Sequence, residues 1–336
     1  MIKILYVGNK LNSKKTNIAA IHTLGALLEA EGLDMSYASS KTKKVFRLFD
    51  MIWSCISLSR KVDFVLIDTY STINFYYALI ISQLCRILKL KYIPILHGGN
   101  LPHRLKKNPK LSQHIFKHAY KNVSPSLFLK AEFKKHGYDD IAFIPNAIEM
   151  DKYAFKEKAF DSVNLLWVRS FSEIYNPSMA IEVLAALKQQ GYAAKLCMVG
   201  PDSDGSIQIV KELAKSLNVD VTFTGKLSKA AWIDLSQDYN IFINTTNFDN
   251  MPVSVIEAMA LGLCVVSTNV GGLPYLISDG NDGVLVPPND CASFVNAIKN
   301  AMRNPSQMKE MTLQARNKVE AFDWQFIKHK WHEVLQ

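Results

Sequence analysis

The stretch from residue 248 to residue 262 constrains the fold more than any other part of the chain. It follows residues 239–244, an apolar segment that we expect to be a buried strand. Pro252 suits the first turn of a helix, because its missing N–H would be unpaired there in any case. Gly262 suits the position just after a helix, where a positive φ is needed. The sequence therefore predicts a short helix directly after a buried strand.

The predicted helix has features of a binding element. Val253, Ile256, Met259 and Ala260 recur at helical spacing, so we expect one face to be buried. The first N–H groups would point out of the sheet and would favour an anion. Glu257 lies further along the same helix, and a buried carboxylate is costly without hydrogen-bond donors. The hydroxyl pair of a sugar or ribose is one obvious source of such donors.

The spacing of Asp249 and Glu257 resembles the Glu-x7-Glu motif of family-4 retaining glycosyltransferases, with an aspartate as the first acid. Residues 264–274 and 282–288 are similar to the same family, so the resemblance covers nearly the whole second half. It implies the GT-B fold, in which two Rossmann-like, doubly wound α/β domains face an interdomain cleft. It also implies transfer of a sugar, with retention, from a nucleotide sugar to an acceptor hydroxyl in bacterial polysaccharide or glycolipid synthesis.

The same resemblance assigns roles to individual residues. The first acid of the motif contacts the donor sugar and the second holds the ribose hydroxyls. Arg169 is implied to bind the donor diphosphate, and a guanidinium suits this because it binds oxyanions through a planar fork. The residues expected to be catalytic are Asp249, His97 and Arg169. The residues expected to bind the donor are Arg169, Lys226, Asn250, Met251, Pro252, Val253, Ser254 and Glu257.

Besides the aspartate at the first acid, the chain departs from the family pattern in a second respect. The family usually has a lysine about five residues after the arginine, whereas this chain has Glu173-Ile174-Tyr175. Lys226 either replaces that lysine or is an exposed loop charge. Two alternatives stay open. One is a non-catalytic nucleotide-sugar-binding subunit, which both departures allow, and the other is a GT-B nucleotide-sugar epimerase. A dinucleotide dehydrogenase is disfavoured, because no Gly-x-Gly-x-x-Gly follows the first strand.

The first half also has the pattern of a doubly wound domain. Residues 1–7 are expected to form a strand, leaving no room for a signal peptide, and a helix over residues 17–31 should stop at Gly32. After a short buried strand over residues 63–68, the next strand, residues 91–96, ends at His97. Ligands of open parallel sheets bind at such strand ends, and the two glycines that follow let backbone approach a ligand closely. The residues expected in the acceptor or cleft loops are Gly8, Asn9, Gly98, Gly99 and Asn100.

A basic and aromatic helix should begin near Lys41. Val45, Leu48, Phe49, Ile52 and Ile56 would make its apolar face, with Phe46 and Trp53 beside it. We expect an ordinary packed helix with a solvated basic end. The alternative is a helix that rests on a membrane surface.

The chain of 336 residues carries a net charge of +9 that is unevenly distributed. Residues 1–160 contain 25 Lys and Arg against 12 Asp and Glu, a net +13, and residues 161–336 carry −4. The basic half suggests an anionic partner, either an anionic membrane or a phosphate-bearing, sugar or lipid-linked acceptor. Nucleic acid ranks low, because the basic residues are not interleaved with aromatic RNA-binding motifs.

The remaining expectations concern compartment, metals and domains. Five scattered cysteines without a Cys-x-x-Cys pair favour a reducing compartment, so we expect a cytoplasmic protein, at the inner face of the membrane if it contacts lipid. No Asp-x-Asp motif stands in a metal-binding context, so we expect no obligatory metal and no cofactor besides a UDP- or GDP-linked donor. The expected domains are residues 1–150 on the acceptor side and residues 160–321 on the donor side, with helix 322–336 packing back on the first.

Overall fold

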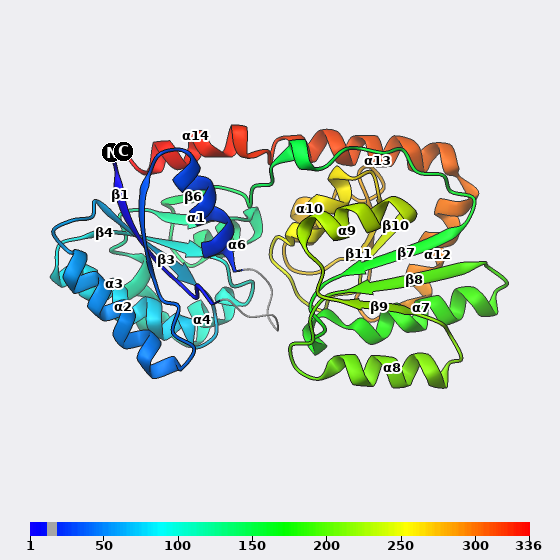
Figure 1. Cartoon of the computed structure of the whole chain (residues 1–336), viewed down its shortest axis with the longest axis horizontal. Coiled ribbons are helices and arrows are strands. Elements are labelled where there is room, and N and C mark those ends of the chain that lie inside the picture. The colour runs from blue at the N-terminus through cyan, green and yellow to red at the C-terminus, as the bar shows by residue number, and fades with distance from the viewer. Residues whose placement is uncertain (12–18) are drawn as a thin grey trace. The chain divides into compact units, whose positions relative to one another are not determined.

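The structure is a computed structural model that describes residues 1–11 and 19–336. The described chain divides into two compact units (Figure 1). The N-terminal unit contains the first strand, residues 19–147 and Trp324–Gln336, and the C-terminal unit contains Ile148–Asp323. Within the described ranges, every helix is too short or too polar to cross a membrane.

A parallel six-stranded sheet forms the centre of the N-terminal unit. Its strand order, β2-β1-β3-β4-β5-β6, reverses direction between β1 and β3. In an open sheet of this kind, ligands bind outside the carboxyl ends of the strands at that switch point. The strands are β1 (Lys3–Val7), β2 (Asp34–Ala38), β3 (Phe64–Thr69), β4 (Lys91–Leu96), β5 (Asn122–Ser124) and β6 (Ile141–Phe143).

Helices cover both faces of this sheet, because its central strands carry apolar side chains on both sides. Ile4 and Tyr6 pack in one core with residues of α1 and α14, whereas Leu5 and Val7 pack in another with residues of α2 and α3. The helices are α1 (Ala20–Ala30), α2 (Lys44–Leu58), α3 (Asn74–Ile87), α4 (Leu101–Lys107), α5 (Pro109–Phe116), α6 (Leu127–Lys135) and α14 (Trp324–Val334). Gly32 follows α1 with a φ of +84°, and residue 17, where the sequence starts this helix, lies outside the described residues.

The buried face of helix α2 differs from the predicted one. Val45, Phe49 and Ile56, expected on the packed face, are exposed. The buried residues are Arg47, Met51 and Cys55, while Leu48 and Ile52 are half-buried. The four-residue spacing of the inward side chains turns the helix so that its aromatic side faces outward. The expectation of an ordinary packed helix is therefore wrong for this face.

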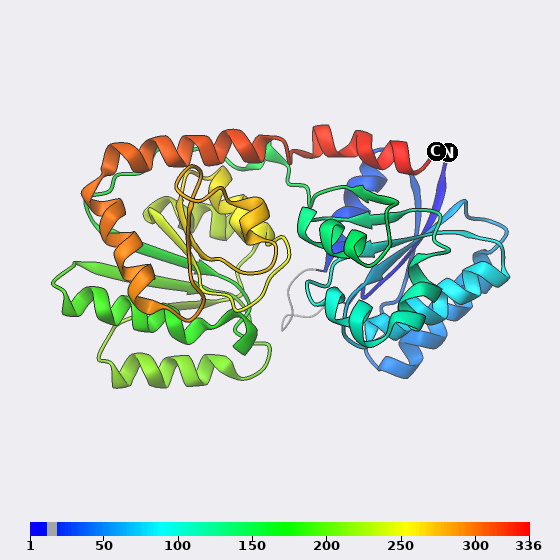
Figure 2. The same ribbon diagram turned by 180° about the vertical axis from the view of Figure 1, so that it is seen from behind.

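The C-terminal unit repeats the architecture around a second parallel six-stranded sheet (Figure 2). Its order, β12-β11-β10-β7-β8-β9, places the switch point between β7 and β10. Leu165 and Trp167 belong to the core on one face, and Leu166 belongs to the core on the other. The strands are β7 (Val163–Val168), β8 (Ala194–Val199), β9 (Thr222–Gly225), β10 (Ile241–Asn244), β11 (Cys264–Thr268) and β12 (Val284–Val286).

Helices flank the second sheet on both faces as well, which confirms the predicted fold class of two doubly wound α/β units. The α-helices are α7 (Pro177–Gln189), α8 (Ser206–Ser216), α9 (Lys229–Leu235), α10 (Val253–Ala260), α11 (Leu273–Leu276), α12 (Cys291–Arg303) and α13 (Pro305–Glu320). The short 3-10 helices are η1 (Met150–Lys152), η2 (Glu173–Tyr175) and η3 (Ser236–Asp238).

Candidate active site

The switch point of the C-terminal unit brings the end of β7 beside the end of β10. Arg169 follows directly after β7, and the loop after β10 carries Asp249 toward α10. The two side chains form an ion pair in which each is 13% exposed. Two residues that the sequence assigns to different parts of a donor are therefore in contact with each other.

Arg169 is held by more than its ion pair. Its guanidinium carbon lies 4.2 Å from the centre of the Tyr175 ring, which fixes the plane of the group. Its Nε is buried and has no hydrogen-bond partner within residues 1–11 and 19–336. A buried donor without a partner carries a free-energy cost that a bound oxyanion would remove. Arg169 is therefore a fixed cation whose Nε–H remains available to a bound oxyanion.

Two glycines fix the loop that carries Asp249. The Gly272 N–H donates to the Asp249 carbonyl at 3.0 Å. A Cβ on Gly272 would lie 1.7 Å from the Asn250 carbonyl oxygen, and Gly271 has a φ of +56°. Only glycine permits this approach, so the backbone of the loop has one position relative to β11 and α11.

Helix α10 differs from its predicted form at both its start and its faces. Pro252 is the residue before the first turn rather than within it, and its ψ of 119° is extended. The helix is buried along its whole length from Val255 to Ala260 rather than on one face, because it packs between β10, β11 and α13. Gly262 follows the helix with a φ of +79°, as predicted.

The first turn of α10 retains bonding capacity. Val253 and Ser254 are half-buried, and the Ser254 Oγ is a buried atom that makes no hydrogen bond to any described residue. Asn250 and Met251, immediately before the helix, are buried. The start of this eight-residue helix therefore places its positive dipole end and the unsatisfied Ser254 hydroxyl next to the loop of Asp249.

Glu257 is 3% exposed, and the protein itself supplies its donors. The Tyr153 hydroxyl donates to Oε1 at 2.7 Å, and the Lys229 ammonium pairs with the same oxygen. Burial and the adjacent carboxylate raise the pKa of the Tyr153 hydroxyl well above its usual range, so it remains a donor at neutral pH. Oε1 therefore has two protein partners, and neither Tyr153 nor Lys229 is among the predicted site residues.

Lys226, proposed from sequence as the replacement cation, is exposed in the loop that follows β9. Lys229, three residues later at the start of α9, is the lysine that reaches the motif. Its position as the first residue of a helix after the Gly225 loop is a signal that could have identified it. Tyr153 follows η1, outside the predicted domain, and no local pattern marks it.

The switch point of the N-terminal unit holds a second cluster. His97 follows β4, and its Nε2 lies 2.8 Å from Asp68 Oδ1 at the end of β3. The Tyr6 hydroxyl donates to the same oxygen at 2.9 Å, and Asp68 Oδ2 is buried without a partner in the described structure. A Cβ on Gly8 would lie 2.5 Å from that oxygen, so Gly8 makes room for the carboxylate. His97 and Gly8 are among the residues predicted from sequence, whereas Asp68 is not, and its strand-end position is the signal that could have identified it.

The other residues predicted for the acceptor or cleft loops lie in loops of the N-terminal unit. Asn9 accepts a hydrogen bond from the buried Arg47 guanidinium at 3.0 Å. A Cβ on Gly98 would lie 2.7 Å from the Ser71 nitrogen, so this glycine is required by packing against the loop after β3. Gly99 is half-buried, and Asn100 is exposed at the start of α4.

Comparison with known proteins agrees with this geometry. The sequence profile of the family described as "Glycosyl transferases group 1" matches residues 150–318. A D-inositol 3-phosphate glycosyltransferase from Gordonia bronchialis is 28% identical over 157 residues, covering 44% of this chain and 34% of the relative. The amylovoran biosynthesis glycosyltransferase AmsK from Erwinia amylovora is 24% identical and covers 79% of this chain and 69% of AmsK. The chain spans between a third and a half of the length of several of its curated relatives.

Solved structures match over the full length of the chain. A sucrose-phosphate synthase from Thermosynechococcus elongatus has a TM-score of 0.84 at 16% identity and covers 99% of this chain, and 98% of that protein is covered. HepE from Anabaena, solved with UDP-glucose, has a TM-score of 0.81 at 15% identity, with 100% and 99% coverage. These matches confirm the expected GT-B fold, and the profile confirms the family that residues 248–288 resemble. The chain belongs to the group 1 glycosyl transferase family.

Proposed function

We propose that this protein transfers a sugar from a UDP- or GDP-linked donor to a hydroxyl of a sugar or lipid-linked acceptor, with retention at the anomeric carbon, in cell-surface polysaccharide or glycolipid synthesis. The observation that carries the proposal is the arrangement after β7 and β10. The Arg169 Nε and the Ser254 Oγ are buried without partners among the described residues, and both border the loop of Asp249 at the switch point. A diphosphate would satisfy both donors.

Each half of the motif has a proposed role in this reaction. The Arg169 guanidinium and the first N–H groups of α10 would hold the diphosphate, where negative charge develops as the glycosidic bond breaks. Asp249 would contact the donor sugar, and Glu257 would accept hydrogen bonds from the ribose hydroxyls through Oε2. His97, held by Asp68, would contact the sugar from the N-terminal unit. Lys226 remains the proposed second cation.

The bond changes are those of a same-face substitution. The acceptor oxygen forms a bond to the anomeric carbon, and the bond from that carbon to the diphosphate oxygen breaks. The acceptor proton passes to an oxygen of the departing diphosphate. This step requires no protein base, and the proposal assigns none.

Support for a nucleotide-sugar donor also comes from relatives. HepE was solved with UDP-glucose, and a relative from Escherichia coli is described as a UDP-Gal:alpha-D-GlcNAc-diphosphoundecaprenol alpha-1,3-galactosyltransferase. The second description motivates a lipid-linked acceptor, in which the acceptor sugar is carried on a polyprenyl diphosphate.

The test is a panel of UDP- and GDP-sugars incubated with sugar and lipid-linked acceptors, with products analysed by mass spectrometry. We expect an acceptor heavier by one sugar and the release of nucleoside diphosphate, both lost in Arg169→Ala. Arg303→Ala, which removes an exposed arginine of the same unit, is the matched control and should keep activity. Donor binding without turnover would identify a binding subunit, and an isomerised donor would identify an epimerase.

A further inference from the structure

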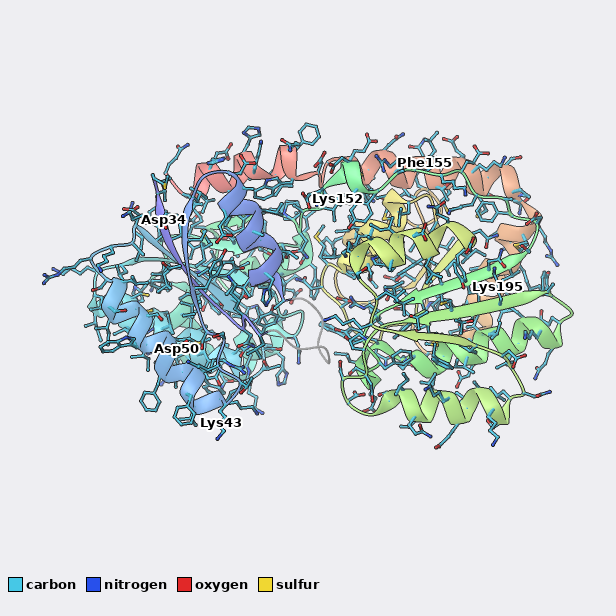
Figure 3. The ribbon with its side chains drawn as sticks, in the orientation of Figure 1. Asp34, Lys43, Asp50, Lys152, Phe155 and Lys195 are labelled. Atoms are coloured by element: carbon cyan, nitrogen blue, oxygen red, sulfur yellow. The ribbon has the colours of Figure 1, made fainter. Side chains whose placement is uncertain are left out.

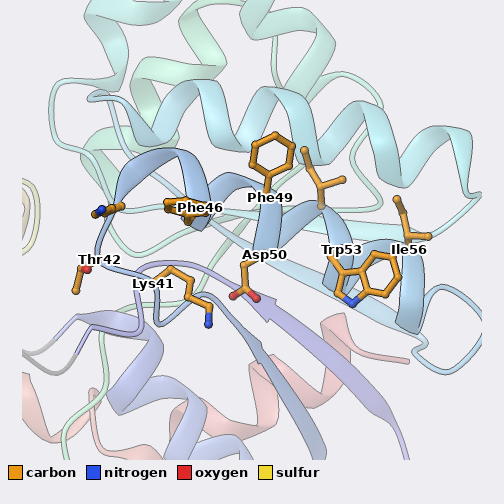
Figure 4. Close-up of a pocket in the computed structure, with 9 residues that line it drawn as sticks. Lys41, Thr42, Phe46, Phe49, Asp50, Trp53 and Ile56 are labelled. Carbon is orange, nitrogen blue, oxygen red and sulfur yellow. The ribbon is translucent and has the colours of Figure 1, made fainter.

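The outward side of α2 carries large apolar side chains that the fold leaves uncovered. Trp53 is 67% exposed, Phe49 65% and Phe46 60%, and Val45 and Ile56 are exposed beside them. Figure 4 shows the two phenylalanines, Trp53 and Ile56 projecting from this one helix. Exposed aromatic clusters of this kind mark interaction sites rather than ordinary protein surface.

The apolar surface extends from α2 onto two neighbouring helices. A groove of about 760 Å³ runs along α2, and a second depression of about 530 Å³ joins it at Ile52. Ile80 and Ile87 of α3 and Leu111 of α5 line the second depression. We call this continuous area the α2–α3–α5 surface, comprising the residues that line the two grooves.

The start of α2 is held rigidly. The buried Arg47 guanidinium donates to the carbonyl of Lys41 at 2.8 Å, to the carbonyl of Thr42 at 2.9 Å and to Asn9 Oδ1 at 3.0 Å. Met51 and Cys55 anchor the opposite side of the helix in the core. The aromatic side is therefore presented outward by the native packing of the helix.

Cations surround the α2–α3–α5 surface. Lys41, Lys43 and Lys44 are exposed at the start of α2, and Lys43 projects away from the ribbon (Figure 3). Among the nine residues lining the first groove, Asp50 is the one acid. The 63 residues between Asp68 and Glu132, which form α3, α4 and α5, contain ten Lys and Arg and no acidic residue.

The local potential is positive at the far end of the surface too. Slight desolvation and the positive charges of Arg86 and Lys117 lower the pKa of His118, an exposed residue just after α5. Lys106, Lys107 and Lys110 are exposed on α4 and α5. An apolar, aromatic centre with a basic surround is the composition of helices that lie in the interface of anionic membranes.

We propose that the α2–α3–α5 surface docks on an anionic lipid bilayer, with Phe46, Phe49 and Trp53 entering the boundary between headgroups and acyl chains and the surrounding lysines contacting lipid phosphates. Charge decides between this occupant and a second copy of the chain. A second copy of the chain would bring the same predominantly basic surface to this contact and no complementary negative surface. A bilayer instead supplies the negative charge that these lysines lack. The proposal is independent of the chemical step.

The protein contains its own reporter for this contact. Trp53 is the exposed tryptophan, whereas Trp167, Trp232, Trp324 and Trp331 are at most 4% exposed. Mixing the full chain with vesicles of phosphatidylcholine and phosphatidylglycerol should shift the tryptophan emission to shorter wavelength. Brominated acyl chains in the same vesicles should quench that emission, and Trp53→Phe should remove both effects. Unchanged wild-type emission and no quenching would overturn the proposal without recourse to any variant.

Vesicle flotation measures how much the aromatic residues and the lysines each contribute to membrane binding. We expect Phe49→Ser combined with Trp53→Ser to weaken vesicle binding. We expect Lys41→Gln, Lys43→Gln and Lys44→Gln together to weaken it by about tenfold or more, since each lysine near an anionic surface contributes roughly fivefold. The lysine triple should also flatten the dependence on salt. Its matched control is Lys188→Gln, Lys211→Gln and Lys215→Gln, exposed lysines of the C-terminal unit that change net charge equally.

Each result has a defined meaning. Equal losses in the two lysine triples would show that net charge alone drives adsorption and would overturn the assigned surface. Equal binding to pure phosphatidylcholine would overturn the anionic partner. A blue shift that depends on protein concentration without vesicles, together with a dimer in sedimentation, would assign the surface to a second copy. Melting temperatures close to that of the wild type establish that the variants are folded.

Discussion

Arg169 and Asp249 neutralise each other in the structure, but their ion pair does not use the Nε of the guanidinium. The unpaired Nε matters because an oxyanion can accept a hydrogen bond from it while the ion pair persists. The first prediction follows from this geometry. Arg169→Ala should lower kcat/KM by roughly 10- to 150-fold, because charge-assisted hydrogen bonds contribute about 1.5–3 kcal/mol.

Arg169→Lys tests whether the planar pair of N–H donors of the guanidinium is needed in addition to its charge. It keeps the charge but removes the planar donor pair and the stacking on Tyr175, so we expect it to recover only part of the activity. The double variant Arg169→Ala with Asp249→Ala removes the unpaired carboxylate that the single variant leaves behind. Wild-type kcat/KM in Arg169→Ala, with the melting temperature unchanged, would contradict the phosphate role.

Substitutions of the two acids of the motif should affect different ligands. Glu257→Gln should weaken binding of the bare nucleoside diphosphate, because the carboxylate would accept the ribose hydroxyls. Asp249→Ala should leave diphosphate affinity nearly unchanged and lower turnover with the intact donor. Isothermal titration with diphosphate and with nucleotide sugar measures both. The reverse pattern would exchange the two assignments.

Tyr153→Phe is the matched control for Glu257, since it keeps the ring in the core and removes one donor to Oε1. We expect a smaller loss of diphosphate affinity than in Glu257→Gln, because Lys229 still holds the carboxylate. An effect equal to that of Glu257→Gln would mean that the tyrosine, rather than the acid, determines the affinity.

Lys158 gives a pH-dependent prediction. Its side chain is 6% exposed and its ammonium donates to the Ser236 carbonyl at 3.0 Å. Burial, with the nearby Lys156, lowers its pKa from 10.5 to about 8. Between these values the unfolded chain binds the proton and the folded chain has lost it, so stability contributed by this group rises with pH over that window.

The free energy of unfolding of the wild type should therefore rise relative to Lys158→Met by up to about 3 kcal/mol between pH 8 and pH 10.5. Denaturant unfolding of both proteins across this range measures the difference, and the variant cancels the contributions of other titrating groups. Parallel curves would show that the Lys158 pKa is the same in the folded and unfolded chains.

At the scale of elements, the glycine pair after β11 leaves room for the backbone of the loop that carries Asp249. Gly272→Ala would force a Cβ to within 1.7 Å of the Asn250 carbonyl oxygen, so the loop of Asp249 must move. We expect a loss of about 1–3 kcal/mol in unfolding free energy, typical of overpacking, and a larger loss of turnover than of stability.

Gly137→Ala separates backbone strain from steric exclusion. Gly137 has a φ of +83° and open space around its Cβ position, so alanine there meets strain alone. Its cost should be about 1–2 kcal/mol, with turnover unchanged. A Gly272→Ala protein with wild-type turnover would show that the loop does not depend on this close contact.

Elements that are buried on both faces could be predicted from sequence, whereas the orientation of α2 could not. The bounds of β4 agree with the sequence, because residues 91–96 are apolar enough for a strand covered by helices. In α2, two apolar stripes compete for the core. Met51 and Cys55 occupy it, and the larger aromatic residues remain outside. Helical periodicity alone does not specify which stripe finds a partner.

At the scale of the molecule, the switch points of the two sheets could be located from sequence. The residues of distant segments that contact the side chains at these points could not. His97, Arg169 and Asp249 stand next to strand ends, and local sequence marks such positions. Tyr153 and Asp68 reach the motifs from segments 104 and 29 residues away. Such contacts depend on which strands become neighbours, and a single sequence does not record that choice.

The two units should respond to different ligands within one full-length chain. The C-terminal unit holds the unpaired donors of Arg169 and Ser254, and the N-terminal unit holds the α2–α3–α5 surface. Hydrogen exchange followed by mass spectrometry measures the response of both units in one experiment. A nucleoside diphosphate should slow exchange in residues 245–260, because binding to the folded state suppresses local opening of the loop and α10. It should leave α2 unchanged.

Anionic vesicles should give the opposite pattern, with slower exchange in α2 and α3 and none of the diphosphate effect in α10. Phosphatidylcholine vesicles are the control for lipid alone, and Glu257→Gln is the control for the nucleotide. Protection of α2 by diphosphate in the absence of lipid would mean that the two ligands act through one equilibrium. Protection confined to each ligand's own unit would mean that donor binding and membrane attachment are separate properties of the chain, so that either can be removed by substitution while the other is kept.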